Sequence, residues 1–217
     1  MQLRERVKTV AKQVLVRTTR GKMMWRGPSD ARRVAITFDD GPGELTEAYL
    51  ETLADLGVPA TFFIMGYYVE QEHLPGAVGK YLRGGHQVAG HGFFHQRFTE
   101  MGARALRSEL DRMHRALGVL PWGKWVRPPH GSFGPRDVAV MLALDYTVAM
   151  WSFDSCDYDG ATADVLVERC RPERVTPGEV MLFHEANHQT LAALPAIVRN
   201  LQADGYELVT MADLLSD

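Results

Sequence analysis

The 217-residue sequence predicts an α/β fold in which seven strands alternate with helices around one closed or nearly closed parallel barrel. Apolar, β-rich runs and segments of helical spacing alternate seven times, which indicates βαβ units. An open doubly wound sheet would carry a glycine-rich phosphate loop after its first strand, and this chain has DDGPG there instead. We therefore predict a barrel over residues 31–217, preceded by an extension over residues 1–30.

The expected strands are short apolar runs bounded by turn residues. They lie at residues 33–38, 59–64, 86–90, 124–127, 145–151, 179–184 and 206–209. Apolar residues at helical spacing predict the helices that follow them, at about 46–56, 69–83, 100–117, 135–143, 161–170, 189–203 and 210–216. Each strand is thus followed by a helix, the order that makes neighbouring strands parallel.

Residues 1–26 carry a strong positive charge. Eight lysines and arginines stand against Glu5 alone, a net +7, which leaves 16 basic and 26 acidic residues, or −10, in the rest of the chain. Two interpretations of this segment stay open: a helix packed on the acidic body, which is favoured, or a surface that contacts anionic membrane lipid. The apolar residues within it recur at helical spacing and predict a basic amphipathic helix: Val7, Val10, Ala11, Val14 and Leu15.

The overall composition, with 46% apolar and 24% charged residues and a net charge of −3, is typical of a soluble globular protein. No run approaches the roughly 18 to 20 apolar residues that span a bilayer. We expect a cytoplasmic protein, membrane-peripheral through residues 1–26, or an exported one if a leader precedes the sequence as written. The acidic body argues against nucleic acid as a partner. Cys156 and Cys170 are expected to be buried free thiols.

Most of the unusual polar residues stand directly after predicted strands. In a parallel barrel the carboxyl ends of the strands form the face where active sites are built. Chance scatter would have put a comparable share in the opposite loops. The sequence therefore predicts one site that gathers Asp39 and Asp40 after the first strand, His91 and His95 after the third, Arg127 after the fourth, Asp154 and Asp157 after the fifth, and His184 at the end of the sixth.

His91 and His95, in the stretch HGFFH, are the candidates for metal ligands. Their spacing lets one helical turn or a tight loop aim both imidazoles at a common point. With a carboxylate from a neighbouring strand they form a two-histidine, one-carboxylate site, which suits zinc or a similar divalent ion. Because Gly92 replaces the glutamate of an HExxH motif, the general base has to come from elsewhere.

Asp39 and Asp40 supply the two missing functions. One carboxylate binds the metal ion, and the other stays off it as a general base. Alternation along the strand aims the two side chains in different directions. The alternative is a solvated Asp-Asp-Gly-Pro turn, which the preceding apolar residues ITF disfavour because they indicate a buried strand end.

Arg127 and His184 are expected beside this pair. A guanidinium at the end of the fourth strand can hold Asp39 ionised and oriented through charge-assisted hydrogen bonds. His184, which ends VMLFH, is a candidate general acid, with Asp157 or Asp154 tuning its pKa.

Five ordered motifs resemble those of the polysaccharide deacetylase superfamily, the NodB-homology or family-four carbohydrate esterases. The resemblance covers about residues 30–215 and implies a distorted (β/α)7 barrel. The segment ATFFIMG, residues 60–66, also resembles the second strand of the family. The motifs are TFDDGP at residues 37–42, HGFFH at 91–95, RPPHG at 127–131, DSCDY at 154–158 and LFH at 182–184.

The resemblance also implies a role for each matching residue. One aspartate would act as a base oriented by an arginine, and a histidine tuned by a second aspartate would act as the acid. The metal would be one divalent ion, Zn²⁺ or another such as Co²⁺. The implied residues are catalytic Asp39, Arg127, His184 and Asp157, metal-binding Asp40, His91 and His95, and substrate-binding His130 (through its backbone N–H), Tyr158 and Leu182.

Four positions depart from the usual motifs of that superfamily. Gly92 stands where Ser or Thr is usual, His130 where Tyr is usual, Tyr158 where Trp is usual, and Glu185 where Asp is common. All charged catalytic positions are kept, whereas substrate-facing ones differ. This pattern predicts retained chemistry on a less usual substrate.

The expected activity is metal-dependent hydrolysis of an N-acetyl group on an amino-sugar glycan or glycoconjugate. An O-acetyl esterase on the same scaffold and a catalytically silent carbohydrate-binding homologue stay open as alternatives. Metal-dependent phosphoryl or nucleic-acid hydrolysis is disfavoured for two reasons: the body of the chain is acidic, and too few carboxylates are present for a two-metal site. Short loops after the strands favour a small or lipid-linked N-acetylhexosamine compound over peptidoglycan or chitin.

Overall fold

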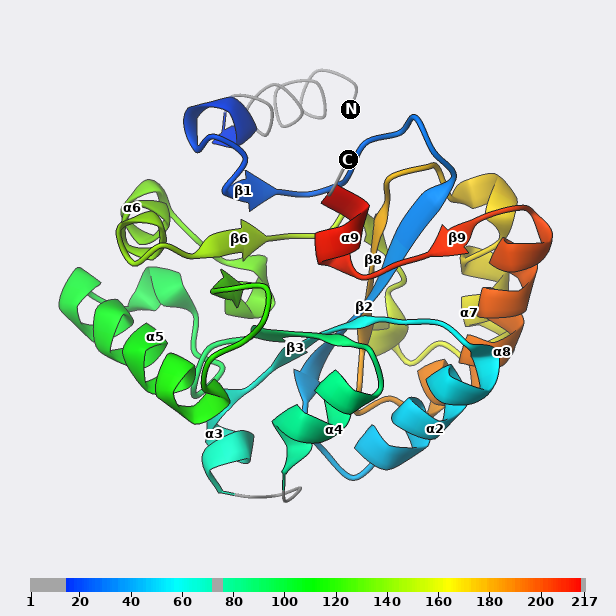
Figure 1. Cartoon of the computed structure of the whole chain (residues 1–217), viewed down its shortest axis with the longest axis horizontal. Coiled ribbons are helices and arrows are strands. Elements are labelled where there is room, and N and C mark those ends of the chain that lie inside the picture. The colour runs from blue at the N-terminus through cyan, green and yellow to red at the C-terminus, as the bar shows by residue number, and fades with distance from the viewer. Residues whose placement is uncertain (1–14, 72–75, 216–217) are drawn as a thin grey trace.

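In the computed structural model, which describes residues 15–71 and 76–215, nine strands form one curled sheet in which every pairing between strands is parallel. The strand order is β1-β6-β5-β4-β3-β2-β8-β7, and β9 pairs with β2 off this path. Helices lie on the outer side, with α5 and α6 on one flank and α2, α7 and α8 on the other (Figure 1). The predicted distorted α/β barrel is confirmed.

All seven predicted strands are present, and two further short strands lie at the ends of the sheet order. These are β1 and β7, which the sequence prediction did not include. The strands span β1 Met23–Met24, β2 Arg33–Gly41, β3 Thr61–Ile64, β4 Gln87–Gly90, β5 Trp125–Val126, β6 Thr147–Ala149, β7 Phe153–Asp154, β8 Val180–His184 and β9 Glu207–Leu208.

The helices also follow the prediction, except that two helices replace the single one expected over residues 69–83. Pro75-Gly76, a break signal in the sequence, stands between them. The helices span α2 Thr46–Leu56, α3 Gly66–Glu70, α4 Ala77–Arg83, α5 Ala103–Leu117, α6 Pro135–Ala143, α7 Ala163–Arg169, α8 His188–Ala203 and α9 Met211–Leu215.

Part of the predicted N-terminal extension belongs to the barrel. Met23 and Met24 pair with β6, and Met23 is fully buried. Lys22 pairs with Asp145 at 2.9 Å. The predicted amphipathic helix falls mostly on residues 1–14, which lie outside the described residues, so its membrane contact stays a prediction. Within the described residues, no helix has the length and apolar character needed to cross a membrane.

Both cysteines are free, as predicted. Cys170 is buried, whereas Cys156 is only half-buried. The expectation of two buried thiols is therefore wrong for Cys156, because this residue belongs to a loop at the open end of the barrel rather than to a helix face.

Alternation along β2 separates the helix-facing core from the barrel interior. Ile36 and Phe38 point outward, and the Phe38 ring stacks 5.1 Å from that of Phe62 in the core beneath the helices. Ala35 belongs to a second, interior core cluster. Two residues further along the strand stand Thr37 and then Asp39, on the same inner side as Ala35.

Helix α9 closes the amino end of the barrel. Its residues Met211 and Leu214 are buried against the interior cluster, and the Met211 amide donates to Thr61 Oγ1 at 2.8 Å. In Figure 1 this helix lies across the centre of the ring of strands. The interior is therefore plugged at its amino end, which leaves the carboxyl ends of the strands free to line a cavity.

Candidate active site

A cavity of ≈ 380 Å³ lies at the carboxyl ends of the strands. Its walls come from β2, β7, β8 and the loops that follow β4, β5, β6 and β7, so segments far apart in the sequence meet there. Almost all the predicted site residues line it. The lining residues are Asp39, Asp40, His91, His95, His130, Gly131, Trp151, Asp154, Tyr158, Leu182 and His184.

A β-bulge at Asp40 lets the adjacent carboxylates of Asp39 and Asp40 line the same cavity. Asp39 keeps the ladder register opposite Phe63, whereas the next paired residue is Gly41 opposite Ile64, so Asp40 is the extra residue. Its φ of +75° turns its side chain away from the regular alternation. The prediction that alternation aims the two side chains in different directions is therefore wrong. The bulge brings Asp40 to the cavity side, where Asp39 Oδ2 and Asp40 Oδ1 each lie 3.5 Å from His91 Nε2.

Glu185 packs against the backbone of this bulge. Its buried carboxyl accepts hydrogen bonds from Tyr81 Oη at 2.7 Å and from Thr46 Oγ1. Burial raises the pKa of Glu185 to about 7, against the opposing effect of these two hydroxyl groups. A Cβ at Gly41 would overlap the Glu185 carboxyl, so glycine is required where the chain passes this close.

The HGFFH loop is held from below by helix α5. Glu109 Oε1 accepts the backbone N–H groups of Phe93 and Phe94, each at 2.8 Å. Gly92 and His95 have φ values of +76° and +58°, so the segment is a tight loop and not a helical turn. Gly92 supplies a conformation that the Ser or Thr expected there would adopt only with strain.

Asp40, His91 and His95 converge on one point. Asp40 Oδ1 lies 3.5 Å from His91 Nε2 and 3.2 Å from His95 Nε2, and the three ligand atoms all lie within 4.8 Å of one another. Tetrahedral zinc ligands about 2.0–2.1 Å from the ion lie roughly 3.3 Å apart, so these separations suit such an ion.

The protonation chemistry of the cluster also fits a metal ion. Burial lowers the pKa of His91 to about 3, and burial likewise lowers the pKa of His95, against the opposing charge of Asp40. His91 Nδ1 bonds the Arg127 carbonyl at 2.9 Å, which leaves the unprotonated Nε2 toward the cluster. Asp40 Oδ1 is buried and accepts no hydrogen bond from the described residues. Neutral imidazoles and an unsatisfied carboxylate oxygen are the donor set that a divalent cation satisfies.

Arg127 lies inside the barrel directly below Asp39. Its Nη1 donates to Asp39 Oδ1 at 2.7 Å and to Thr37 Oγ1 at 2.9 Å, and the carbonyls of Ala149 and Met150 accept its other N–H groups. Burial raises the pKa of Asp39, and the Arg127 guanidinium opposes that rise. Asp39 is therefore a stronger base than an exposed aspartate, and its orientation is fixed.

His184 and Asp157 form a hydrogen-bonded pair on the opposite wall. Asp157 Oδ1 bonds His184 Nδ1 at 2.7 Å, and its Oδ2 accepts from the His184 amide and from Thr190 Oγ1, both at 2.8 Å. Burial acts to lower the pKa of His184, but the hydrogen bond and charge of Asp157, together with the charges of Asp39 and Asp40, outweigh it, so the net pKa is raised. His184 Nε2 is the ring nitrogen left for a ligand.

The predicted substrate-side residues also line the cavity. Leu182 is buried on the inner side of β8, and the Tyr158 ring meets the His184 ring edge to face at 5.6 Å. The His130 ring lies 4.4 Å from the His95 ring. Asp154 accepts a hydrogen bond from Tyr158 Oη at 3.3 Å, whereas Asp157 bonds His184 Nδ1, so Asp157 rather than Asp154 is the hydrogen-bond partner of the histidine.

Comparison with known proteins places this cavity in context. The sequence profile described as Polysaccharide deacetylase matches residues 26–149, more than half of the chain. The chain belongs to the polysaccharide deacetylase family. This is the family of NodB-homology, family-four carbohydrate esterases that the five motifs indicated.

The proteins similar to this chain include some that are named as deacetylases and one that is named as a pseudoenzyme. The peptidoglycan-N-acetylglucosamine deacetylase PgdA of Listeria monocytogenes is 31% identical over 191 residues, which are 86% of this chain and 39% of that protein. The crystal structure of the Bc1960 peptidoglycan N-acetylglucosamine deacetylase matches with a TM-score of 0.83 at 26% identity, covering 89% of this chain and 92% of that one. A family-four pseudoenzyme from Bacillus anthracis, BA3943, matches with a TM-score of 0.81 at 25% identity, covering 89% and 69%.

Three residues of the site escaped the sequence analysis. Trp151 is the last residue of the predicted strand 145–151, so the rule used for the other strand ends would have found it. Thr190, which bonds Asp157, and Glu109, which supports the HGFFH loop, lie on helices at positions with no distinguishing pattern. Only the packing of the helices on the loops shows what these two side chains bond.

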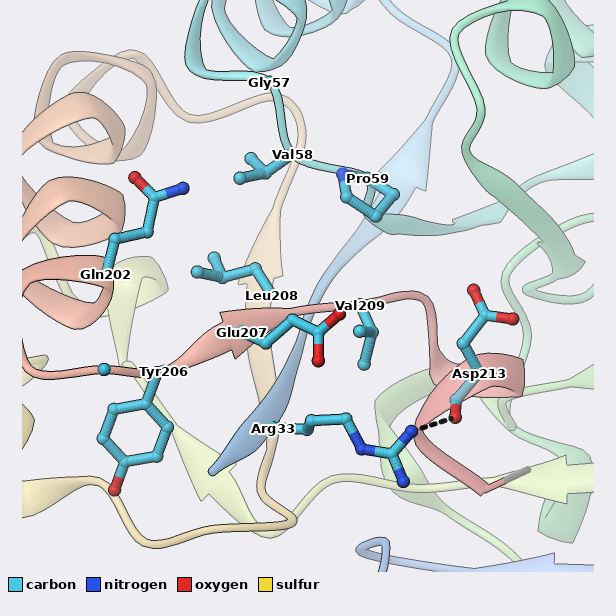
Figure 2. A pocket seen from close by; sticks show the side chains of 11 residues that line it. Arg33, Gly57, Val58, Pro59, Gln202, Tyr206, Glu207, Leu208, Val209 and Asp213 are labelled. Atoms are coloured by element: carbon cyan, nitrogen blue, oxygen red, sulfur yellow. Dashed lines mark hydrogen bonds between the residues drawn. The ribbon is translucent and has the colours of Figure 1, made fainter. Parts of the chain in front are cut away.

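A larger hollow of ≈ 730 Å³ lies at the opposite, amino end of the barrel. Figure 2 shows its lining from the start of β2, the loop before β3 and the segment around β9. Arg33, on its floor, donates to the Asp213 carbonyl at 3.3 Å. This hollow contains no histidine or cysteine among its lining residues, and none of the predicted site residues lies there.

Proposed function

We propose that this chain is a metal-dependent hydrolase that removes N-acetyl groups from an N-acetylglucosamine-containing glycan and releases acetate. The observation that carries the proposal is the arrangement of the cavity. A base held by Arg127 and an acid held by Asp157 both line it, beside three side chains that fit one divalent ion. A binding protein has no need of a separate base and acid.

The ion would be held by Asp40, His91 and His95, with Zn²⁺ proposed and Co²⁺ as an alternative. When bound, it supplies positive charge that polarises the acetyl carbonyl and lowers the pKa of the attacking water. The donor set of two imidazoles and one carboxylate leaves coordination positions open, as catalytic sites require.

The residues of the chain provide the proton transfers. Asp39 takes a proton from the attacking water while the oxygen of that water bonds to the acetyl carbon. The C–N bond then breaks, and His184 gives its Nε2 proton to the departing nitrogen, which leaves acetate and a free amine. The raised pKa of each group suits its role, since Asp39 holds a proton more readily and His184 remains charged to higher pH.

The substrate is proposed from the relatives. PgdA of Listeria monocytogenes and the Bc1960 protein are named for peptidoglycan N-acetylglucosamine. This chain spans about two fifths of the length of the Listeria relative, so the substrate and partners of the longer protein come to it only as a proposal. The names of the relatives favour a glycan chain over the small or lipid-linked compound that the sequence suggested.

The test is an acetate-release assay with added Zn²⁺ or Co²⁺ on N-acetylglucosamine oligomers, peptidoglycan fragments and lipid-linked or nucleotide-linked amino sugars. Release from one class supports the proposal. No release from any, with stoichiometric metal bound, would make the chain a silent homologue like the pseudoenzyme neighbour.

A second assay separates the amide from the ester reaction. An amine is a poor leaving group without a proton, whereas an alcohol depends on the acid less. His184→Ala is therefore expected to abolish amide hydrolysis and to spare acetyl-ester hydrolysis. Equal loss on both substrates would contradict the assignment of His184 as the acid.

A further inference from the structure

Two exposed aromatic rings flank the metal-ligand cluster. In the described part of the chain, Phe94 and Tyr158 are the phenylalanine, tyrosine and tryptophan side chains with high exposure, at 46% and 63%. The other large apolar side chains with high exposure are valines. Exposing an aromatic ring to water costs about 25 cal/mol per Å² of apolar surface, so rings gathered at one site indicate a binding surface.

The two rings belong to adjoining hollows. Tyr158 lines the ≈ 380 Å³ cavity described above. Phe94 lines a neighbouring groove of ≈ 800 Å³ together with Pro42, Met65 and Tyr68. Asp40 and His95 line both hollows, so the groove begins at the cluster itself and runs on beyond the cavity.

Packing holds the Phe94 ring in place although half of it faces water. The ring lies edge to face with that of Phe93, with the centroids 4.6 Å apart, and 5.8 Å from that of Tyr67. The Arg112 guanidinium lies 5.2 Å from the ring centroid and is itself bonded to Glu70 at 2.7 Å. A ring fixed in this way loses little conformational freedom when a ligand covers its open face.

The chemistry of the groove suits a sugar. A pyranose ring presents a flat C–H face, which packs on an aromatic ring, and a rim of hydroxyl groups, which hydrogen-bond to polar atoms. The groove supplies the Phe94 ring and, at its edge, the Glu44 carboxylate, which can accept hydrogen bonds from hydroxyl groups. The cavity volume is at the small end of ligand pockets, about 300 to 1,000 Å³, so the rest of a glycan has to lie outside it.

We propose that Phe94 binds the sugar unit next to the one that is deacetylated, and that this contact makes the enzyme prefer an oligosaccharide to a single acetylated sugar. The inference rests on the proposed function and adds to it a residue that sets chain-length preference. Phe94 takes no part in the proton transfers, since its role is to hold the neighbouring unit.

The test compares acetate release from N-acetylglucosamine and from its β-1,4-linked oligomers of two to five units, with Zn²⁺ added to the full chain. For the unchanged protein, we expect kcat/KM to rise at least about 10-fold between one unit and the longer oligomers. Phe94→Ala should remove most of that rise by increasing KM for the oligomers. It should leave kcat/KM for the single sugar within about twofold of the unchanged protein. Phe94→Trp should restore the preference because it keeps an aromatic face.

Two controls separate binding from damage to the loop. Val119→Ala removes an apolar side chain that is 94% exposed and lines none of the hollows described, so it should change nothing. The Zn²⁺ content of Phe94→Ala should equal that of the unchanged protein, because its backbone N–H still bonds Glu109.

The outcomes distinguish this inference from the proposed function. If the unchanged protein releases no acetate from any substrate class, the proposed function is wrong. If it does release acetate, and Phe94→Ala keeps the full chain-length preference, the role of Phe94 is wrong. If Phe94→Ala lowers kcat/KM equally for the single sugar and for the oligomers, and also binds less zinc, Phe94 has a structural role and the inference is overturned.

Discussion

The two ends of the barrel carry hollows of opposite character. The amino-end hollow is nearly twice as large as the carboxyl-end cavity, at ≈ 730 against ≈ 380 Å³. Its polar side chains lie spread along its walls (Figure 2), and Arg33 bonds a backbone carbonyl. In the smaller cavity, titratable groups converge and their pKa values are shifted by burial and by one another. Convergence of shifted groups, rather than volume, therefore marks the site.

The largest loss of activity is expected from Asp40→Ala, a change in the carboxyl-end cavity. This change removes a ligand from the cluster, and because the ion stabilises the transition state by several kcal/mol, acetate release should fall by about 10³-fold or more. Bound zinc, measured by release to a chelator dye, should fall with it. Unchanged zinc content would overturn the proposed metal site.

Asp39→Asn tests the role of the base and leaves the three metal ligands in place. The amide keeps the shape of the side chain and can still meet Arg127, but it accepts no proton. We expect kcat to fall about 10²- to 10⁴-fold, the usual contribution of a general base, with zinc content unchanged. A fall below about tenfold at saturating zinc would assign the base elsewhere.

Glu109 tests the support of the HGFFH loop. Glu109→Ala removes the acceptor of the Phe93 and Phe94 amides, and residues that orient metal ligands typically contribute about 10- to 100-fold to metal affinity. Zinc affinity should fall by that factor in a competition titration. Glu109→Gln keeps an acceptor oxygen and should restore most of the affinity; equal loss in both variants would mean that the negative charge, and not the hydrogen bonds, matters.

Asp157→Asn tests the acid through the pH profile. The Asp157 carboxylate stabilises the charged form of His184 and raises its pKa, so removing the carboxylate lowers that pKa. The reaction needs protonated His184, so activity is lost as pH rises through its pKa. The alkaline limb of kcat/KM should therefore move to lower pH, with about a tenfold loss on that limb for a shift of one unit. A limb that stays in place would show that another group titrates there.

The smallest effect is expected at the amino end. Glu207→Ala changes an exposed carboxylate of the larger hollow, and it is the matched control for Asp40→Ala. Acetate release should stay within about twofold and the free energy of unfolding within about 0.5 kcal/mol. A large loss of activity would contradict the conclusion that the carboxyl-end cavity, and not the amino-end hollow, is the active site.

The local pattern of the sequence was enough to predict the strands, most helices and the residues that gather at one face. Strand length and helical spacing are properties of a few consecutive residues, and parallel strands necessarily bring their carboxyl ends together. The short strands β1 and β7 were missed because they lie outside the apolar runs that predicted strands, whereas β5 and β9, which are equally short, lie within such runs. The predicted roles of the site residues stay predictions, although the structure brings those residues into one cavity.

Only the tertiary structure decided that Asp39 and Asp40 face the same cavity. Alternation in the sequence says that neighbours diverge, but the bulge at Asp40 depends on β3 and on the Glu185 carboxyl packed against Gly41, which come from distant parts of the chain. The shifted pKa values likewise arise from burial, which no short stretch of sequence specifies. The sequence by itself determined which chemical groups are present and which face they share, because those follow from local periodicity. The fold decided their distances, partners and charge states, because these depend on contacts between residues far apart in the chain.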